Sequence, residues 1–93
     1  MICSFVIPAY NASNTIIRCL DSIYKLPLNE NEFEVILIDD CSTDNTMEVV
    51  EEYAVKRTNI TLLRQSKNHR QGAARNRGID IAKGKYVVFL DSE

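Results

Sequence analysis

The 93-residue sequence lacks several features that mark common classes of protein. It has no apolar run near the roughly 20 residues that a membrane-spanning helix needs, and Met1 leads directly into a strand-like segment without a signal peptide. Its three cysteines are an odd number, widely spaced and without a CxxC pair, which argues against a disulfide framework or a zinc site. We therefore expect one small cytoplasmic domain with reduced cysteines.

Two familiar phosphate-binding motifs are also absent. No segment matches G-x-x-x-x-G-K-[ST], and Gly72, Gly78 and Gly84 do not fit G-x-G-x-x-G. The sequence is therefore not expected to be a P-loop NTPase or a dinucleotide-dependent dehydrogenase. It also contains no internal repeat and no low-complexity segment.

What is present is an ordinary globular composition with an uneven distribution of charge. Hydrophobic residues make up 45% of the chain and charged residues 26%, with a net charge of −2. Between Arg64 and Lys85, however, basic residues predominate and Asp80 is the only acid. Arginines in this segment could offset the charge of a diphosphate, because the planar guanidinium pairs well with phosphate oxygens.

The hydrophobic pattern predicts alternating strands and helices. Strands are expected over residues 2–8, 33–38, 60–63 and 86–90, and helices over 15–24, 45–56 and 71–82. Pro8 should close the first strand, since proline cannot donate to a ladder, and Gly84 should cap the third helix. This order predicts an α/β fold, a Rossmann-like three-layer α/β/α sandwich with a mainly parallel sheet.

Carboxylates directly follow two of the predicted strands. Asp39 and Asp40 come after the apolar run 35–38, and Asp91 and Glu93 come after the strand 86–90. Open α/β sheets bind ligands at the carboxyl ends of their strands, so we expect these acids to converge on one edge. There they could chelate Mg²⁺ or Mn²⁺, hydrogen-bond a ribose or base, or do acid–base work. With arginines for phosphate and Tyr10 to stack on a base, the residues predict a nucleotide-diphosphate site.

Four segments in order, over essentially the whole chain, resemble the amino-terminal half of family 2 glycosyltransferases. They are residues 5–11 (FVIPAYN), 35–44 (VILIDDCSTD), 72–78 (GAARNRG) and 84–93 (GKYVVFLDSE). The resemblance implies a partial GT-A fold in which residues 1–93 form one nucleotide-sugar-binding domain of an inverting, metal-dependent glycosyltransferase. The donor would be a nucleoside-diphosphate sugar, usually a UDP-sugar, and the acceptor a hydroxyl in polysaccharide or glycoconjugate synthesis, as for a cell wall or capsule.

The same resemblance assigns roles to individual residues. Pro8 and Tyr10 match positions that line the nucleobase, and Asp40 matches the acid that hydrogen-bonds it. The nucleotide-sugar-binding residues implied are Pro8, Tyr10, Asp39, Asp40, Arg70, Arg75 and Asp91. Asp91 and Glu93 fall on the DxD motif and are the implied ligands of Mn²⁺ or Mg²⁺. No catalytic residue is expected in this chain, because the acceptor-binding half with the base would follow Glu93, and the 93 residues alone should be inactive.

Three positions depart from the family pattern. Glu93 replaces the usual final aspartate, Arg70 stands where many members have glycine, and Cys41 replaces a commoner glycine. A glutamate can still ligate a metal, but its extra methylene changes the geometry. Cys41 is interpreted as a tolerated small residue.

Simpler structural roles remain open for several of these residues. Asp39 can instead cap the following turn, and Asp44 is better interpreted as a helix cap than as a ligand. Arg77 points away from Arg75 on a helix and is expected to be solvated or ion-paired. Tyr10 can be a packed aromatic, and His69 is expected to be neither ligand nor base.

Two alternatives from other classes also remain. A non-catalytic α/β module could act through self-association of an uncovered sheet edge, giving a homodimer. A receiver-like signalling domain is disfavoured, because Pro8–Tyr10 and Arg64–Ser66 stand where that class needs acids. No nucleic-acid partner is expected, whereas a longer enzyme could associate peripherally with the inner face of a membrane.

Overall fold

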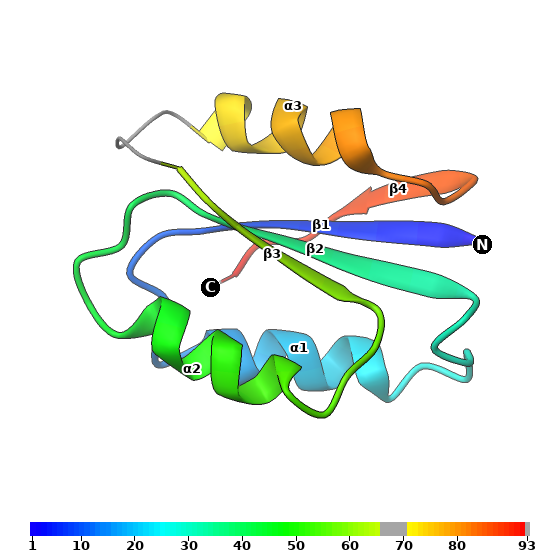
Figure 1. The fold of residues 1–93 in the computed structure, drawn as a ribbon, viewed down its shortest axis with the longest axis horizontal. Coiled ribbons are helices and arrows are strands. Elements are labelled where there is room, and N and C mark those ends of the chain that lie inside the picture. Colours follow the sequence, from blue (N-terminus) through cyan, green and yellow to red (C-terminus); the bar gives the residue numbers. More distant parts are fainter. Residues whose placement is uncertain (66–70, 93) are drawn as a thin grey trace.

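The computed structural model describes residues 1–65 and 71–92, and it contains every predicted strand and helix (Figure 1). The observed ends differ from the predicted ones by at most two residues. In chain order the elements are β1 (Cys3–Ala9), α1 (Ile16–Tyr24), β2 (Phe33–Asp39), α2 (Thr46–Ala54), β3 (Ile60–Arg64), α3 (Gln71–Ile81) and β4 (Tyr86–Phe89).

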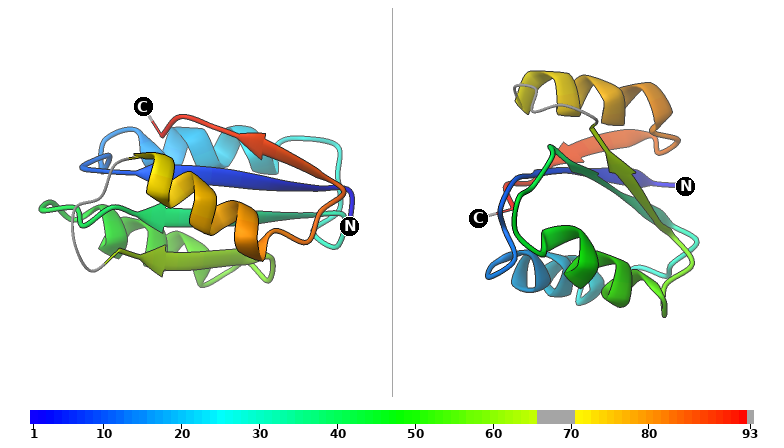
Figure 2. Two further views of the ribbon diagram at one scale, coloured as in Figure 1. Left: turned by 90° about the horizontal axis from the view of Figure 1, so that it is seen from above. Right: turned by 60° about the vertical axis from the view of Figure 1, so that its left-hand side comes forward.

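The four strands form one parallel sheet in the order β3-β2-β1-β4. Helices α1 and α2 cover one face and α3 covers the other (Figures 1 and 2). This arrangement confirms the three-layer sandwich predicted from the sequence. β1 and β2 pair in register along their whole lengths, from Cys3 opposite Phe33 to Ala9 opposite Asp39. The two central strands therefore end side by side.

The core explains why β1 and β2 are apolar at almost every position. All seven residues of each strand are buried. Alternate side chains point to opposite faces, so Phe5 and Ile7 pack toward α1 and α2 while Val6 and Ile38 pack toward α3. In α1 the buried stripe is Ile16, Leu20 and Ile23, as its periodicity predicts.

The predicted role of Pro8 is wrong in one respect, because β1 continues through Pro8 to Ala9. The Val6 carbonyl accepts a hydrogen bond from the Leu90 amide on the β4 side (3.0 Å), and Pro8 lies two residues further along that side. β4 has ended there, so the missing N–H of Pro8 costs no ladder bond. Pairing with β2 continues instead, with the Asp40 amide donating to the Ala9 carbonyl (2.8 Å).

Gly84 is needed for a close approach and not as a left-handed helix cap. No described glycine has a positive φ, and a Cβ on Gly84 would lie 2.4 Å from the Cys3 carbonyl carbon. The Gly84 amide donates to the Ser4 hydroxyl (2.8 Å), and the Lys83 amide donates to the buried Glu34 carboxylate (2.6 Å). These bonds fix the turn that leads into β4 against the start of the sheet.

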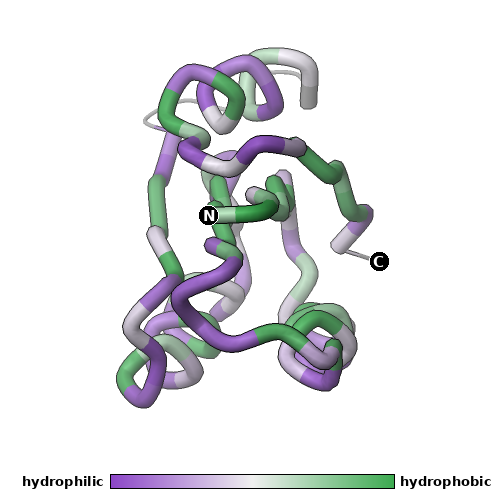
Figure 3. Tube along the Cα trace, turned by 90° about the vertical axis from the view of Figure 1, so that its right-hand side faces the viewer, coloured by the Kyte–Doolittle hydropathy of each residue, from purple (hydrophilic) through white to green (hydrophobic). Residues whose placement is uncertain are grey.

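β4 forms an exposed apolar edge. Each of its four residues is at least 37% exposed, and Tyr86 is 59% exposed. Figure 3 shows this hydrophobic segment on the outer flank of the sheet, close to the C mark. Within residues 1–65 and 71–92, none of the helices combines the length and the apolar character that crossing a membrane requires.

The packing of α3 on the sheet predicts opposite effects at two of its glycines. A Cβ on Gly78 would lie 2.4 Å from Val6 Cγ1 and 3.1 Å from Ile38 Cδ1, whereas one on Gly72 meets nothing within 4 Å. Gly78→Ala should therefore lower the free energy of unfolding by about 1–3 kcal/mol. Gly72→Ala, the matched control, should leave it unchanged or raise it by up to about 1 kcal/mol. Urea denaturation measures both, and equal effects would contradict this account of the α3 packing.

Candidate functional site

The carboxyl ends of three neighbouring strands bring together residues that are distant in sequence. Tyr10 follows β1, Asp40 follows β2, and Asp91 follows β4 after one further residue. β1 lies between the other two strands, so Tyr10 stands between the two acids along the sheet edge. Tyr10 is 42% exposed and Asp91 is exposed, whereas Asp40 is only 5% exposed. Pro8 is buried at the same end of β1.

Asp39 is the structural anchor of the turn that follows β2. Its side chain is fully buried, and its carboxylate accepts hydrogen bonds from the Ser42 amide (3.0 Å) and the Ser42 hydroxyl. The Arg64 guanidinium of β3 lies 3.7 Å away. These contacts support the capping role that the sequence left open for Asp39, beside its predicted place in the nucleotide site.

The loops after β1 and β2 are hydrogen-bonded to each other. The Asn11 amide donates to the Ser42 hydroxyl (2.9 Å), and the Asn11 side-chain carbonyl accepts from the Thr43 amide (2.8 Å). Asn11 and Cys41 both have left-handed backbones, with φ of 47° and 62°. The left-handed region is unfavourable for residues with a Cβ, so the backbone explains why glycine suits the position of Cys41.

Asp44 lies one residue before Asn45, the N-cap of α2, and bonds the first amide of the helix, which is close to the capping role that the sequence predicts for Asp44. Its carboxylate accepts hydrogen bonds from the Thr46 amide (3.0 Å), the Thr46 hydroxyl and, at 3.4 Å, the Ser13 amide. The bonds from Thr46 and Ser13 hold the pKa of Asp44 below its usual value. Because they favour the ionised carboxylate, this contribution to stability is lost as the pH falls through that lowered pKa.

The two arginines of α3, Arg75 and Arg77, differ in their contacts and exposure. Arg77 donates to the Gln65 side-chain carbonyl (2.7 Å) and to the Arg64 backbone carbonyl (3.1 Å), so it ties α3 to the end of β3. Arg75 is exposed in the first half of α3, the half nearer the carboxyl edge of the sheet (Figure 1). Arg70 lies outside the described residues.

The chain beyond β4 runs against the start of α1. The Thr15 hydroxyl donates to the Ser92 carbonyl (2.7 Å), and the Cys19 thiol donates to the Asp91 carbonyl (3.6 Å). Cys19 is only half-buried, and its thiol makes this polar contact. Burial and the nearby Asp91 carboxylate raise the pKa of the Cys19 thiol. Sequence reasoning placed Thr15 at a helix start and gave no signal for its partner 77 residues away.

Of the two predicted ligands of Mn²⁺ or Mg²⁺, the structure describes one, Asp91, and its chemistry suits such an ion. Among residues 1–65 and 71–92 there is no group of three side chains suited to hold a metal ion. The exposed Asp91 carboxylate is nevertheless the hard oxygen ligand that Mg²⁺ and Mn²⁺ take, and such ions are commonly held by one or two carboxylates together with substrate phosphates. Glu93, the second predicted ligand, lies outside the described residues.

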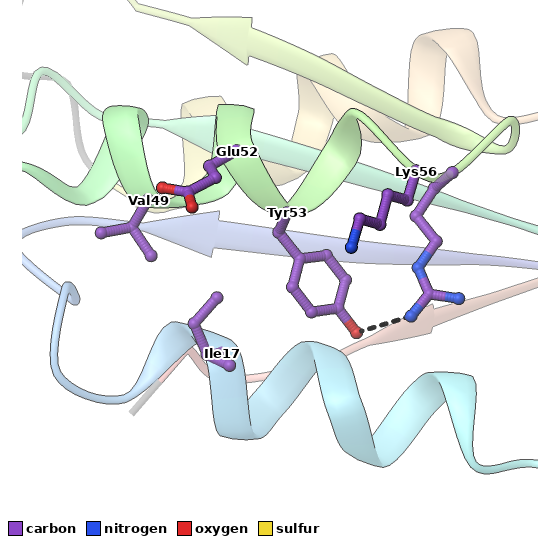
Figure 4. Close-up of a pocket in the computed structure, with 6 residues that line it drawn as sticks. Ile17, Val49, Glu52, Tyr53 and Lys56 are labelled. Carbon is purple, nitrogen blue, oxygen red and sulfur yellow. Dashed lines mark hydrogen bonds between the residues drawn. The ribbon is translucent and has the colours of Figure 1, made fainter.

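A cavity of about 450 Å³ between α1 and α2 is separate from this edge (Figure 4). It is lined by Ile17, Val49, Glu52, Tyr53, Lys56 and Arg57. Arg57 stacks 4.1 Å from the ring centre of Tyr24 and donates to the Tyr53 hydroxyl (3.4 Å), which in turn donates to Asp21 (2.9 Å). These contacts join the two helices and give Tyr53 and Arg57, two polar residues of the cavity, partners within the protein.

Comparison with known proteins identifies the family. The family model described as Glycosyl transferase family 2 matches residues 4–92. The chain belongs to glycosyltransferase family 2. The poly(ribitol-phosphate) beta-glucosyltransferase of Bacillus spizizenii is 38% identical over 91 residues, which cover 97% of this chain and 14% of that protein. The amylovoran biosynthesis glycosyltransferase AmsB of Erwinia amylovora is 48% identical over 98 residues, which cover 97% of this chain and 30% of that protein.

Solved structures share the GT-A fold of this family 2 chain. S. aureus TarS 1-349 in complex with UDP-GlcNAc has a TM-score of 0.93 and 38% identity, covering 99% of this chain and 26% of that one. A mannosyltransferase from Pyrobaculum calidifontis in complex with GDP-Man and Mn²⁺ has a TM-score of 0.90 and 28% identity, covering 97% and 27%. The chain spans only part of the length of its curated relatives. The shares are 14% for the Bacillus spizizenii enzyme, 30% for AmsB and 35% for TuaG of Bacillus subtilis.

The contacts of Asp39 predict that it matters more for folding than its neighbour Asp44. Asp39→Ala removes a buried acceptor of two Ser42 hydrogen bonds and should lower the free energy of unfolding by roughly 2–4 kcal/mol. Asp44→Ala removes the exposed acceptor of the first α2 amide and should cost less than this. Urea denaturation of both variants tests the ranking, and an Asp39→Ala protein as stable as Asp44→Ala would show that Asp39 is not the anchor of the turn.

Proposed function

We propose that the chain is the donor-binding part of a glycosyltransferase that uses a nucleoside-diphosphate sugar, with a UDP-sugar as the donor. The observation that carries the proposal is the convergence of Tyr10, Asp40 and Asp91 at the carboxyl edge of β1, β2 and β4. Parallel sheets bind ligands at this edge. The likeness to TarS structures in complex with UDP-GlcNAc and with UDP supports the choice of donor class.

The donor-binding roles follow the order of the strands. Tyr10, exposed beside the buried Pro8, stacks on the nucleobase, and Asp40 accepts a hydrogen bond from it. Asp39 contributes indirectly, because it holds the turn that carries Asp40. Arg75, together with Arg70, lies toward the diphosphate, where a guanidinium offsets the phosphate charge.

The acidic end of β4 completes the proposed site. Asp91 and Glu93 would hold Mn²⁺ or Mg²⁺ there; when bound, the ion neutralises charge on the departing diphosphate. In the transfer, a bond forms between the acceptor oxygen and the anomeric carbon while the bond from that carbon to the phosphate oxygen breaks. The acceptor proton passes to a base, which we do not assign within these 93 residues. Polysaccharide or glycoconjugate synthesis is the proposed setting, in line with the poly(ribitol-phosphate) and amylovoran relatives.

The direct test is calorimetric titration of the chain with UDP, with and without Mn²⁺. We expect weak binding in the presence of Mn²⁺, and no detectable sugar transfer by the 93 residues. Absence of UDP binding under both conditions would overturn the proposed site, and robust transfer would overturn the proposal that the base lies elsewhere.

Asp40 offers a sharper form of the same test. Asp40→Ala removes the acceptor proposed for the base and should weaken UDP binding about ten- to a hundredfold, while the fold is largely retained. Asp80→Ala, which removes an exposed carboxylate from α3, is the matched control and should leave the affinity unchanged. Equal affinities of the two variants would reject the role of Asp40.

A second candidate function is self-association through β4. The exposed apolar side chains of this edge strand favour it, because uncovered edges pair readily with further strands. Size-exclusion chromatography distinguishes the candidates: a dimer that persists with and without UDP and Mn²⁺ supports self-association, and a monomer at all concentrations excludes it.

A further inference from the structure

Two donors on one side of α1 hold consecutive carbonyls of the segment after β4. Thr15 and Cys19 are four residues apart, so they lie one turn apart on the same face of the helix. The Thr15 hydroxyl donates to the Ser92 carbonyl (2.7 Å) and the Cys19 thiol to the Asp91 carbonyl (3.6 Å). Both residues also line a cavity of about 380 Å³ that Asp91 borders.

The bonds from Thr15 and Cys19 begin just after the last backbone hydrogen bond between this segment and the sheet. Among the backbone–backbone hydrogen bonds of the described residues, the last one from this segment to the sheet joins the Leu90 amide to the Val6 carbonyl (3.0 Å). Beyond it, Ser92 is 4% exposed and is held by Thr15, while Asp91 is exposed. The backbone is thus held on both sides of Asp91, at the Leu90 amide and at the Ser92 carbonyl.

The Thr15 hydroxyl does not cap α1, the helix that follows it. A threonine at an N-cap usually accepts a hydrogen bond from an amide of the first turn. Here Thr15 occupies that position but makes no side-chain capping bond, and its other contact, to the Ala12 carbonyl, is long at 3.4 Å. The short bond to Ser92 is therefore its main interaction.

We propose that Thr15, assisted by Cys19, is a positioning residue that orients Asp91 toward the metal–diphosphate part of the donor. The proposal rests on the proposed function, because it assumes that Asp91 meets the metal or the nucleotide. It adds that α1, which contributes no ligand itself, determines how well the acidic segment binds. The single hydroxyl of Thr15 carries most of this effect, since a thiol is a weak donor.

The experiment measures the affinity of the full chain for Mn²⁺ at saturating UDP, with free Mn²⁺ followed by electron paramagnetic resonance. Thr15→Val keeps the shape of the side chain but removes the donor, and should weaken Mn²⁺ binding about three- to tenfold. Thr15→Ser keeps the hydroxyl and should bind within about twofold of the parent chain. Ser22→Ala is the matched control, because Ser22 lines the same cavity but donates to the Cys19 carbonyl within α1.

The results distinguish three things: the positioning role of Thr15, the folding of each variant, and the proposed donor-binding function. Mn²⁺ affinity unchanged in Thr15→Val overturns the inference, and so does equal weakening in Thr15→Ser or Ser22→Ala. Circular dichroism confirms folding, and Thr15→Ala replaces Thr15→Val if the latter does not fold. A parent chain that binds no Mn²⁺ with UDP overturns the proposed function and the inference with it, a result distinct from the others because it appears before any substitution.

Discussion

The parallel pairing of β1 with β2 is the interaction on which the rest of the structure depends. The two strands are buried on both faces and are in register to their last residues, Ala9 and Asp39. Because they end level, the loops that follow begin side by side and can bond to each other through Asn11 and Ser42. A slip of one residue would turn every apolar side chain to the opposite face and separate these loops.

The helices on the two faces of the sheet make different contacts near the carboxyl edge. On one face α3 packs against Val6 and Ile38 closely enough that Gly78 leaves no room for a Cβ. On the other face, Thr15 at the N-cap of α1 bonds to the segment after β4. The carboxyl edge therefore has two parts: the β1 and β2 loops, which Asp39 anchors, and the segment after β4, which Thr15 holds. At such an edge, the anchored β1 and β2 loops would fix the position of a ligand, and the acids after β4 would supply charge.

Much of this arrangement can be predicted from local sequence. Apolar runs and turn residues give the strands, the helices and their order, and acids after two strands predict a common edge. Contacts between distant segments cannot be predicted in this way: the Thr15–Ser92 bond and the Ser42 bonds to Asp39 depend on strand register and loop conformation. The prediction that β1 ends at Pro8 is wrong because the position of Pro8 relative to β4, rather than its residue type, decides whether an N–H is needed. Arg70 and Glu93, two residues of the predicted site, lie outside the described residues.

The central claim is that the carboxyl edge of β1, β2 and β4 binds a nucleoside diphosphate. The most direct measurement is a nuclear magnetic resonance titration of the isotopically labelled chain with UDP and Mg²⁺, which follows backbone amide shifts. The account predicts that the largest shifts occur at Tyr10, Asp40 and Asp91, with small shifts along the α1–α2 cavity that Tyr53 and Arg57 line. Shifts centred on that cavity, or none at saturating UDP, would contradict it.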